Sequence, residues 1–328
     1  MSTSCYLALT GGVGGAKLAL GLSQILDGDD LAMIVNTGDD FQHLGLHISP
    51  DIDTLVYTLA GKNNPETGWG RSDETWHFMQ ALESLGGETW FSLGDRDLAM
   101  NVERSYRLGT GQTLSQVTAA LAAALGIRHT ILPMSDDPVR TRVLTAQGPM
   151  DFQHYFVREK CAPVINGFDF EGIDRARPLP DIETWLMRPG LAGVFLCPSN
   201  PFVSVDPILS LPGLREMLKT CPAPVIAVSP VVGGAAIKGP TVKMMKELAI
   251  PHTASWVAEH YRDFLDGFIL DAEDQALRPE IENLGLRVEV TNTVMVSLED
   301  RVHLARACLD LAQKLKPFPE PAGYTSRR

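Results

Sequence analysis

The chain has 328 residues, of which 45% are hydrophobic, and its formal net charge at pH 7 is -12. This length fits one large α/β domain or two unequal ones, and the hydrophobic fraction is sufficient for a full core. The acidic charge argues against a nucleic-acid partner, because nucleic-acid binders usually present a basic face.

The sequence also predicts a compartment. No stretch reaches the roughly 18 uncharged apolar residues that a membrane helix needs, so we expect no membrane association. The N-terminus lacks a basic segment followed by a long apolar core, so we expect no signal peptide. The cysteines are scattered and form no C-x-x-C pair, which favours a reducing environment without disulfides or thiolate zinc. We therefore expect a cytoplasmic protein.

Apolar, β-rich runs alternate with helical patterns along much of the chain. Continuous apolar runs are typical of parallel strands that are buried on both faces. The predicted strands are Cys5–Thr10, Leu31–Asn36, His129–Pro133, Gly193–Cys197, Val225–Ser229, Phe268–Leu270 and Arg287–Val290. The predicted helices are Ala16–Leu26, Leu114–Leu125, Leu211–Lys219, Thr241–Glu247 and Ala254–Phe264. This alternation predicts a doubly wound α/β fold with a mostly parallel sheet.

Residues 54–125 interrupt the alternation with mostly helical patterning. This segment also carries three tryptophans, Trp69, Trp76 and Trp90. We predict that it is an inserted, smaller helical subdomain that caps the ligand edge of the sheet. The nucleotide-binding core would then consist of residues 1–53 and 126–316.

Two other segments depart from the pattern. Residues 158–190 hold many proline, glycine and charged residues, which predicts a second, irregular excursion. The tail at 317–328 is predicted to be flexible, because chain ends fray unless they are tied down.

A glycine-rich loop, "TGGVGGAK", follows the first predicted strand. Ligands of open α/β sheets bind beyond the carboxyl ends of the strands. Here Gly12, Gly14 and Gly15 would let backbone N–H groups approach a phosphate at the start of the next helix, and Lys17 is a candidate counter-charge. The loop matches neither a Walker A loop nor a complete dinucleotide fingerprint. The alternative is a tight turn that allows close helix packing.

Four acids lie near the end of the second predicted strand: Asp39, Asp40, Asp51 and Asp53. Four carboxylates this close repel one another unless a cation or protons intervene. Mg²⁺ held by one or two of these carboxylates and by substrate phosphate oxygens fits the pattern. Two alternatives stay open, because Asp51 could cap a helix that begins near Asp53 and Asp39 could hold a ribose hydroxyl.

Later loops add polar candidates. The stretch "SLGDRDLAMNVERS" places Asp95 and Arg96 at a helix start, where acids favour the positive end of the helix dipole. Arg96 and Arg104 could instead pair with a substrate phosphate. The small residues of "PSNP" and "SPVVGGAAIKGP" allow backbone approach to a nucleotide, and Lys238 is a candidate phosphate partner.

In combination and order, these stretches resemble the 2-phospho-L-lactate transferase family, which builds a deazaflavin hydride-carrier coenzyme. The matching stretches run from residue 7 to about residue 312 and include "GGVGGAKLALGL", "VNTGDDF", "SPDIDTLVYTL", "LGDRDLA" and "PSNPFVSVDPILSLPG". The resemblance implies a Rossmann-like fold with a smaller helical part, a Mg²⁺ cofactor and a homodimer.

The resemblance also implies the reaction. A phospho-three-carbon-acid group moves from a guanosine diphosphate ester to the terminal ribityl hydroxyl of the deazaflavin Fo, and GMP leaves. The acid could be phospholactyl, phosphoenolpyruvyl or phosphoglyceryl. Asp39, Asp51 and Asp53 are the candidate catalytic and metal-binding residues. The implied Fo contacts are Asp51, Asp95 and Arg96, and the implied nucleotide and phosphate contacts are Gly12, Gly14, Gly15, Lys17, Ser199, Asn200, Ser229, Gly233 and Gly234.

Two other functions compete with this interpretation. The first is a non-enzymatic, UDP-sugar-binding regulator of a related cell-shape family that shares the glycine loop; "LGDRDLA" together with "SPDIDT" favours the transferases. The second is an NAD-dependent dehydrogenase, suggested by the glycine turn and Asp39. The missing third glycine and the crowd of acids argue against it.

Overall fold

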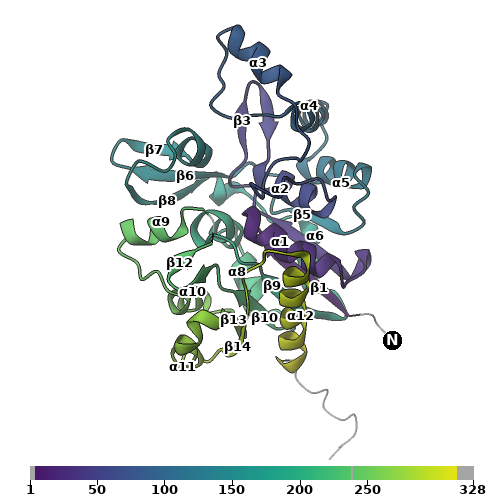
Figure 1. Ribbon diagram of the computed structural model, residues 1–328. Coiled ribbons are helices and arrows are strands. Elements are labelled where there is room, and N and C mark those ends of the chain that lie inside the picture. Colours follow the sequence, from purple (N-terminus) through teal and green to yellow (C-terminus); the bar gives the residue numbers. More distant parts are fainter. Residues whose placement is uncertain (1–3, 238, 316–328) are drawn as a thin grey trace, which may run out of the picture.

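A seven-stranded parallel sheet forms the centre of the molecule in the computed structural model, which describes residues 4–237 and 239–315 (Figure 1). Lys238 and the predicted tail at 317–328 lie outside the described residues. The strands, in spatial order, are β14 (Arg287–Thr291), β13 (Gly267–Asp271), β10 (Val225–Val228), β9 (Leu191–Leu196), β1 (Cys5–Thr10), β2 (Leu31–Val35) and β5 (Thr130–Pro133). Each strand overlaps a predicted run, so the predicted α/β fold is confirmed.

The strand order reverses between β1 and β9. From β1 the chain continues outward through β2 and β5, and it then returns to build β9, β10, β13 and β14 on the other side of β1. In such sheets the ligand crevice opens at this reversal, beyond the carboxyl ends of the strands. The segments that follow β1 and β9 are therefore placed to form a site.

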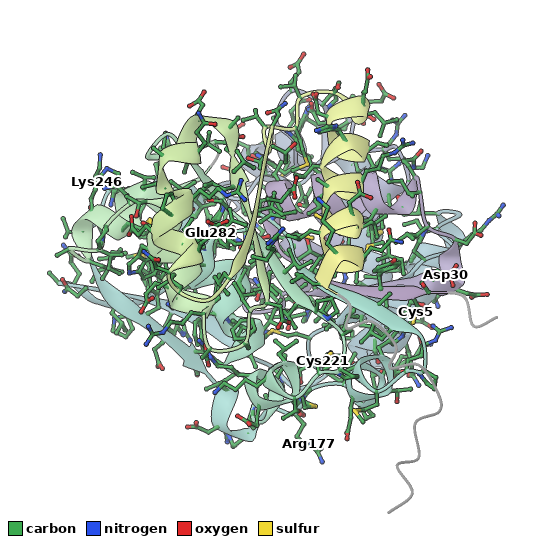
Figure 2. The ribbon with its side chains drawn as sticks, turned by 90° about the horizontal axis from the view of Figure 1, so that it is seen from below. Cys5, Asp30, Arg177, Cys221, Lys246 and Glu282 are labelled. Atoms are coloured by element: carbon green, nitrogen blue, oxygen red, sulfur yellow. The ribbon has the colours of Figure 1, made fainter. Side chains whose placement is uncertain are left out.

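Helices cover both faces of the sheet (Figure 2). Alternate strand residues supply the two apolar faces, as Leu7 and Ala8 do on β1. One face packs against α1 (Gly12–Ser23), α2 (Pro50–Leu59), α5 (Leu114–Ala124) and α12 (Leu298–Leu315). The other packs against α6 (Pro180–Leu186), α7 (Asp206–Leu209), α8 (Leu214–Lys219), α9 (Thr241–Glu247), α10 (Ala254–Tyr261) and α11 (Arg278–Glu282).

The segment between β2 and β5 divides between two hydrophobic cores. Its helices α2 and α5 pack on the central sheet. The hairpin of β3 (Phe41–His43) and β4 (Leu46–Ile48), together with α3 (His77–Ser84), builds a separate small core. In Figure 1 this hairpin, α3 and α4 (Asp95–Gly109) form the upper part of the molecule.

Some elements differ from the predicted ones. Residues 158–190, predicted to be irregular, contain β8 (Ile165–Glu171) and α6, and β8 pairs with β6 (Arg140–Thr145) and β7 (Gly148–Asp151) in an antiparallel sheet. The strand β6 alternates buried and half-buried residues, so it lacks the continuous apolar run of the central strands. The long helix α12 was not predicted, because its apolar residues form only one stripe among charged ones.

Short segments complete the chain. A two-stranded hairpin of β11 (Val231–Val232) and β12 (Ala235–Ala236) follows β10. Short segments of 3₁₀- and π-helix occur at η1 (Gly28–Asp30), η2 (His154–Arg158), η3 (Ile173–Arg175), η4 (Pro201–Val205) and η5 (Ala272–Leu277). Among the described helices, none combines the length and apolar character that a membrane span requires.

The cysteines are all free thiols, as the sequence predicts. Cys5 begins β1 and Cys221 follows α8, and both are labelled in Figure 2. No disulfide therefore contributes to the stability of the fold, which rests on the two apolar faces of the sheet.

Close packing of α1 on α12 yields a stability prediction. A Cβ added at Gly21 would lie 2.1 Å from the Arg301 backbone oxygen. We expect Gly21→Ala to lower the free energy of unfolding by about 1–3 kcal/mol, as overpacking does, measured by urea denaturation. The control is Gly109→Ala, whose Cβ meets nothing within 4 Å in α4. Equal stability of the two variants would contradict the prediction.

Candidate active site

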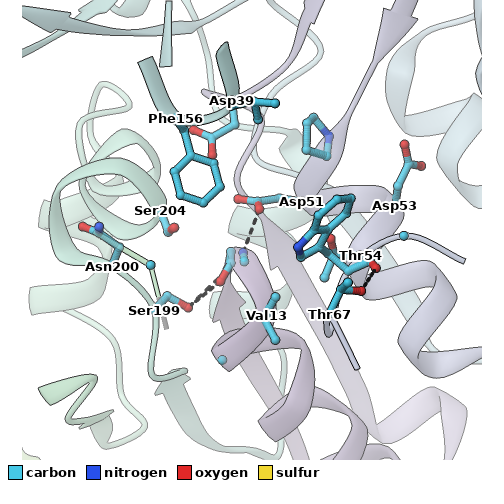
Figure 3. A pocket seen from close by; sticks show the side chains of 18 of the residues that line it. Val13, Asp39, Asp51, Asp53, Thr54, Thr67, Phe156, Ser199, Asn200 and Ser204 are labelled. Carbon is cyan, nitrogen blue, oxygen red and sulfur yellow. Dashed lines mark hydrogen bonds between the residues drawn. The ribbon is translucent and has the colours of Figure 1, made fainter. Parts of the chain in front are cut away.

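A cavity of about 540 Å³ opens where the strand order reverses (Figure 3). Most of the predicted site residues line it: Gly12, Gly14, Lys17, Asp39, Asp51, Asp53, Ser199, Asn200 and Ser229. The predicted residues that do not line it are Gly15, Asp95, Arg96, Gly233 and Gly234. The structure thus brings together side chains from segments that are far apart in the sequence.

The glycine loop is the first turn of α1, which begins at Gly12 and not at Ala16 as predicted. Gly12 has a φ of 64°, which a side chain rarely adopts. A Cβ at Gly14 would lie 2.2 Å from the Pro198 backbone oxygen, and one at Gly15 would lie 2.2 Å from the Thr10 hydroxyl oxygen. Gly14 and Gly15 therefore allow close packing of α1 against the loops around it.

A reciprocal pair of hydrogen bonds joins the ends of β1 and β9. The Ser199 hydroxyl donates to the Gly11 carbonyl oxygen at 2.8 Å, and the Gly11 N–H donates to Ser199 Oγ at 3.3 Å (Figure 3). Both bonds are buried. They fix the distance between the two loops that border the polar end of the cavity.

Asp51 lies in the first turn of α2 and connects it to α1 and β2. Its Oδ1 accepts a hydrogen bond from the Gly12 N–H at 2.7 Å, and its Oδ2 accepts one from Asn36 Nδ2 at 2.9 Å. Asn36 also donates to the Val203 carbonyl oxygen and accepts from the Gly38 N–H, so its orientation is fixed. Burial raises the pKa of Asp51 to about 6, although both hydrogen bonds to Asp51 favour its carboxylate.

Asp39 is buried at the end of β2, and its Oδ1 has no hydrogen-bond partner among the described residues. Burial, and then the charge of Asp51, raise the pKa of Asp39 well above its ordinary value. An ionised carboxylate is only an acceptor, so this oxygen is suited to a proton or a cation. Asp39 and Asp51 are therefore the residues here that could help to hold Mg²⁺ together with substrate oxygens.

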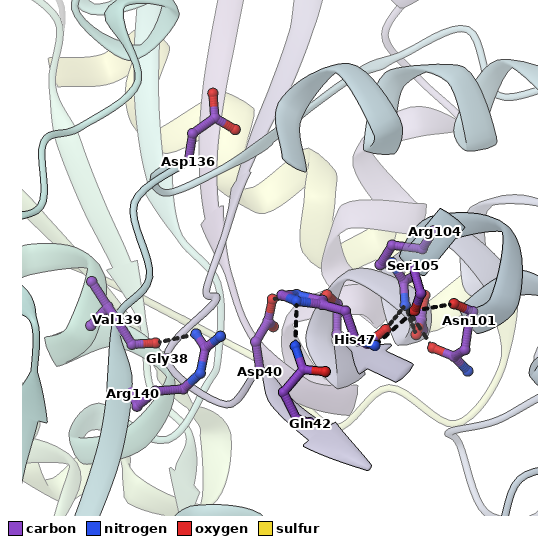
Figure 4. A network of polar contacts seen from close by, with 12 residues as sticks. Gly38, Asp40, Gln42, His47, Asn101, Arg104, Ser105, Asp136, Val139 and Arg140 are labelled. Carbon is purple, nitrogen blue, oxygen red and sulfur yellow. Dashed lines mark hydrogen bonds and ion pairs between the residues drawn. The ribbon is translucent and has the colours of Figure 1, made fainter. Parts of the chain in front are cut away.

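Asp53 has a different partner. Arg104, buried in α4, donates from both terminal nitrogens to the Asp53 carboxylate, and also to the side-chain oxygen of Asn101 and the backbone oxygen of His47 (Figure 4). In Figure 3 Asp53 lies apart from Asp39 and Asp51. Among residues 4–237 and 239–315, no three His, Cys, Asp or Glu side chains form a metal-binding group. Arg104 thus neutralises Asp53, and the three-carboxylate Mg²⁺ site stays a prediction.

Other predicted site residues have structural partners. Asp95 accepts hydrogen bonds from the Thr75 hydroxyl and from the N–H groups of His77 and Phe78, so it caps the start of α3. Arg96 is exposed beside it. Gly233 and Gly234 have positive φ angles in the turn between β11 and β12. Capping and turn geometry use the same residue types as ligand contacts, so the predicted substrate contacts of these residues stay predictions.

Lys17, Asn200 and Ser229 line the cavity and are also held by the protein. Lys17 Nζ donates to the Met295 carbonyl oxygen at 2.7 Å. Asn200 Oδ1 accepts from the Phe202 N–H, and the Ser229 hydroxyl donates to the Val231 carbonyl oxygen. The polar end of the cavity is thus preorganised by contacts within the protein.

Where the cavity is bordered by the predicted insertion, its lining is aromatic, and we call this part the aromatic end; the individual motifs did not predict it. Trp69 and Trp76 are exposed and border the cavity, with side chains 56% and 45% exposed. The other aromatic lining residues are Tyr57, Trp90, Phe91, Phe152 and Phe156. The sequence indicated this aromatic lining only through the group of tryptophans in the predicted insertion. A single sequence does not distinguish aromatic ligand contacts from aromatic core residues, which are more common.

Comparison with known proteins gives a consistent result. Residues 7–304 match the family described as 2-phospho-L-lactate transferase CofD. A phosphoenolpyruvate transferase of Kitasatospora aureofaciens is 38% identical over 317 residues, which cover 94% of this chain and 98% of that protein. A 2-phospho-L-lactate transferase of Methanosarcina mazei is 38% identical over 299 residues, which cover 91% and 97%. One of Methanocaldococcus jannaschii is 35% identical over 311 residues, covering 94% and 98%.

A solved structure supports the fold. A UPF0052 family protein from Bacillus halodurans superposes with a TM-score of 0.61 at 13% sequence identity. The match covers 94% of this chain and 99% of that one. The likeness shows that the two chains share their overall architecture.

The buried Arg104–Asp53 pair yields a prediction about stability. We expect Arg104→Met to lower the free energy of unfolding by about 3–5 kcal/mol, because it leaves the Asp53 carboxylate buried without a partner. Denaturant titration measures the effect. The matched control is Arg107→Met in the same helix, whose ion pair with Glu103 is at the surface and should contribute only about 0–1 kcal/mol. The double change Arg104→Met with Asp53→Asn should restore much of the loss.

The raised pKa of Asp51 yields a prediction about pH. A folded-state pKa of about 6, above the ordinary 3.8, means that the folded protein binds the proton more tightly than the unfolded chain. This contribution to stability is complete below the ordinary pKa and is lost as the pH rises through about 6. We therefore expect wild type to lose stability relative to Asp51→Asn between pH 4 and pH 7 in urea titrations.

A second aspartate provides the control with the opposite sign. Hydrogen bonding to Arg215 lowers the pKa of Asp263 to about 2, so its contribution is already complete above the ordinary pKa. The stability difference between wild type and Asp263→Asn should therefore stay constant from pH 4 to pH 7. A constant difference for Asp51→Asn as well would contradict the prediction.

Proposed function

The chain belongs to the 2-phospho-L-lactate transferase CofD family, and on this premise we propose the reaction that it catalyses. A phospho-three-carbon-acid group moves from a guanosine diphosphate ester to the terminal ribityl hydroxyl of the deazaflavin Fo. The hydroxyl oxygen forms a bond to the phosphorus that bears the acid, the bond from that phosphorus to the GMP oxygen breaks, and GMP leaves.

The division of the cavity into two ends supports this proposal most directly. The polar end lies where β1 and β9 meet and is bordered by the first turn of α1, Ser199 and Asn200. A nucleotide diphosphate fits a site at the carboxyl ends of these strands. The aromatic end, which includes Trp69, Trp76 and Trp90, suits a planar ring system. One cavity can thus hold both substrates with their reacting groups between these ends.

The proposed base that accepts the proton of the attacking hydroxyl is Asp51. Its two hydrogen bonds fix the carboxylate between the glycine turn of α1 and the aromatic end of the cavity. A pKa of about 6 makes it a stronger base than an ordinary aspartate while it stays largely ionised at neutral pH. The proton therefore moves from the hydroxyl oxygen to an Asp51 oxygen as the new bond to phosphorus forms.

A divalent cation fits Asp39. The unpartnered Oδ1 of Asp39 is an oxygen ligand of the kind that Mg²⁺ prefers. Mg²⁺ bound there with substrate oxygens would neutralise negative charge on the phosphates and favour departure of GMP. Without the positive charge of a cation, the carboxylates of Asp39 and Asp51 would repel an anionic donor.

The test is direct transfer by the purified protein. It is incubated with Fo, Mg²⁺ and guanylylated phospholactate, phosphoenolpyruvate or 3-phosphoglycerate in turn, and the product mass is measured. We expect one acid to give a product whose mass equals Fo plus the phosphorylated acid minus one water, together with GMP. Relatives named for phospholactate and for phosphoenolpyruvate are both 38% identical to this chain, so product mass decides between these donors. No transfer, together with thermal stabilisation only by a UDP-sugar, would refute the proposal.

Replacement of the proposed base tests the assignment of Asp51. We expect Asp51→Asn to lower kcat by about 10²- to 10⁴-fold, the usual contribution of general base catalysis. Asp263→Asn, an exchange of the same kind far from the cavity lining, should keep kcat near the wild-type value. Folding of both variants is checked by circular dichroism. Asp51→Asn turnover within threefold of wild type would rule out its role as base.

A further inference from the structure

A polar cluster of Tyr57, Arg71 and Asp97 lies in the aromatic end of the cavity, and the proposed chemistry does not use it. Tyr57 lies on α2, six residues after Asp51. A helix rises about 1.5 Å per residue, so Tyr57 lies about 9 Å from Asp51 along the helix axis. The cluster therefore suits a different part of a substrate from the part that would react beside Asp51.

Arg71 is held in place, and among the described residues it forms no ion pair with an acidic side chain. Its backbone pairs with Asn63, which closes the loop between them, and its guanidinium lies over the Tyr57 ring at 5.4 Å from the ring centroid. The Nε is buried and has no hydrogen-bond partner among the described residues. A buried donor without a partner costs free energy, so a ligand acceptor is expected opposite this guanidinium.

Asp97 provides a carboxylate acceptor, which complements the donor groups of Arg71. Its Oδ1 accepts a hydrogen bond from the Tyr57 hydroxyl at 2.6 Å. The neighbouring Glu74 is already hydrogen-bonded to the backbone. Its two carboxylate oxygens accept hydrogen bonds from the N–H groups of Arg96 and Asp97. Among the described ion pairs, Arg71 and Asp97 do not pair with each other, although both contact Tyr57 and both line the cavity. A donor group and an acceptor group thus contact the same tyrosine and line the same cavity, so that one ligand could bind both.

The walls around this cluster are flat and apolar. Trp69, Trp76 and Trp90 line the same end of the cavity, and aromatic side chains favour stacking with a planar ring. The aromatic walls suit the ring faces, while Arg71 and Asp97 suit a polar ring edge. A ligand edge that alternates carbonyl oxygen and N–H matches a guanidinium next to a carboxylate.

We propose that Arg71 and Asp97 recognise the polar edge of the planar acceptor, with Arg71 donating to ring carbonyl oxygens and Asp97 accepting a ring N–H. This inference rests on the proposed function, because it concerns the acceptor in the same cavity. These contacts would orient the acceptor in the cavity. The carbonyl and N–H edge of its ring points toward the inserted segment, and the chain bearing the reacting hydroxyl points toward Asp51. Arg71 and Asp97 are then residues that determine specificity for the acceptor.

The first experiment separates acceptor binding from turnover. The dissociation constant of Fo alone is measured by fluorescence titration for wild type, Arg71→Met and the exposed control Arg262→Met. We expect Arg71→Met to bind Fo about 10- to 100-fold more weakly, the usual effect of losing hydrogen bonds to a charged group. Arg262→Met should match wild type. Steady-state kinetics should show the same rise in KM for Fo, with KM for the guanylylated donor within twofold of wild type.

The second experiment tests the pairing of Asp97 with the ring N–H. Methylation of the ring nitrogen of Fo should weaken binding to wild type, and much less so to Asp97→Asn, because the substituted side chain has already lost the carboxylate. Asparagine keeps an oxygen for the Tyr57 hydroxyl, so this variant is expected to fold. An equal methylation penalty in both proteins would overturn the role of Asp97.

The outcomes distinguish this inference from the proposed function. If wild type transfers no group to Fo and does not bind it, the proposed function fails and this inference fails with it. If wild type is active but Arg71→Met keeps the wild-type dissociation constant for Fo, only the inference is overturned. A rise in KM for the donor instead of for Fo would also overturn it, because Arg71 would then recognise the donor carboxylate.

Discussion

The polar end of the cavity depends on the carboxylate of Asp51. This side chain lies in the first turn of α2 and accepts hydrogen bonds from the first turn of α1 and from Asn36 at the end of β2. Asn36 continues the connection to the loop after β9 through the Val203 carbonyl oxygen. Two helix starts and two strand ends are therefore aligned by one buried acid. This contact is also why the Gly12 N–H, which the sequence predicts to hold a phosphate, already has a partner within the protein.

Negative charge is the second constraint on the site, because the proposed donor is an anion and the cavity is lined by several acids. Three of these carboxylates differ in what partners them within the protein. Asp53 is neutralised by Arg104, Asp51 is stabilised by two hydrogen bonds, and Asp39 keeps an oxygen unpartnered. Among the described residues, the only lysine and arginine that line the cavity are Lys17 and Arg71. A bound cation would complement the phosphates of the proposed donor where these two side chains do not reach.

The sequence predicted the fold, whereas the partners of single residues depend on tertiary structure that local patterns do not specify. The central strands were predictable because each is a continuous apolar run, and the meeting of the loops after β1 and β9 follows from the rules of open sheets. The ion pair of Asp53 with Arg104 was not predictable, because it joins two helices whose relative placement no local pattern specifies. Asp95 and Gly233 match the motifs of ligand contacts, yet tertiary structure uses them for a helix cap and a turn. The sequence did not indicate Arg71 as a site residue, since its stacking on Tyr57 depends on how a loop folds over α2. The homodimer and the three-carbon acid stay predictions.

The contact between Lys17 and the Met295 carbonyl oxygen joins positions that are 278 residues apart in the chain. Such long-range contacts form late, because a parallel sheet must close its crossovers before distant segments can meet. On the ribosome, the glycine turn therefore emerges well before the segment around Met295 that accepts the hydrogen bond from Lys17. A nascent chain that has not yet reached Met295 lacks this contact, so the lysine side chain is fixed beside the cavity only after that segment has folded.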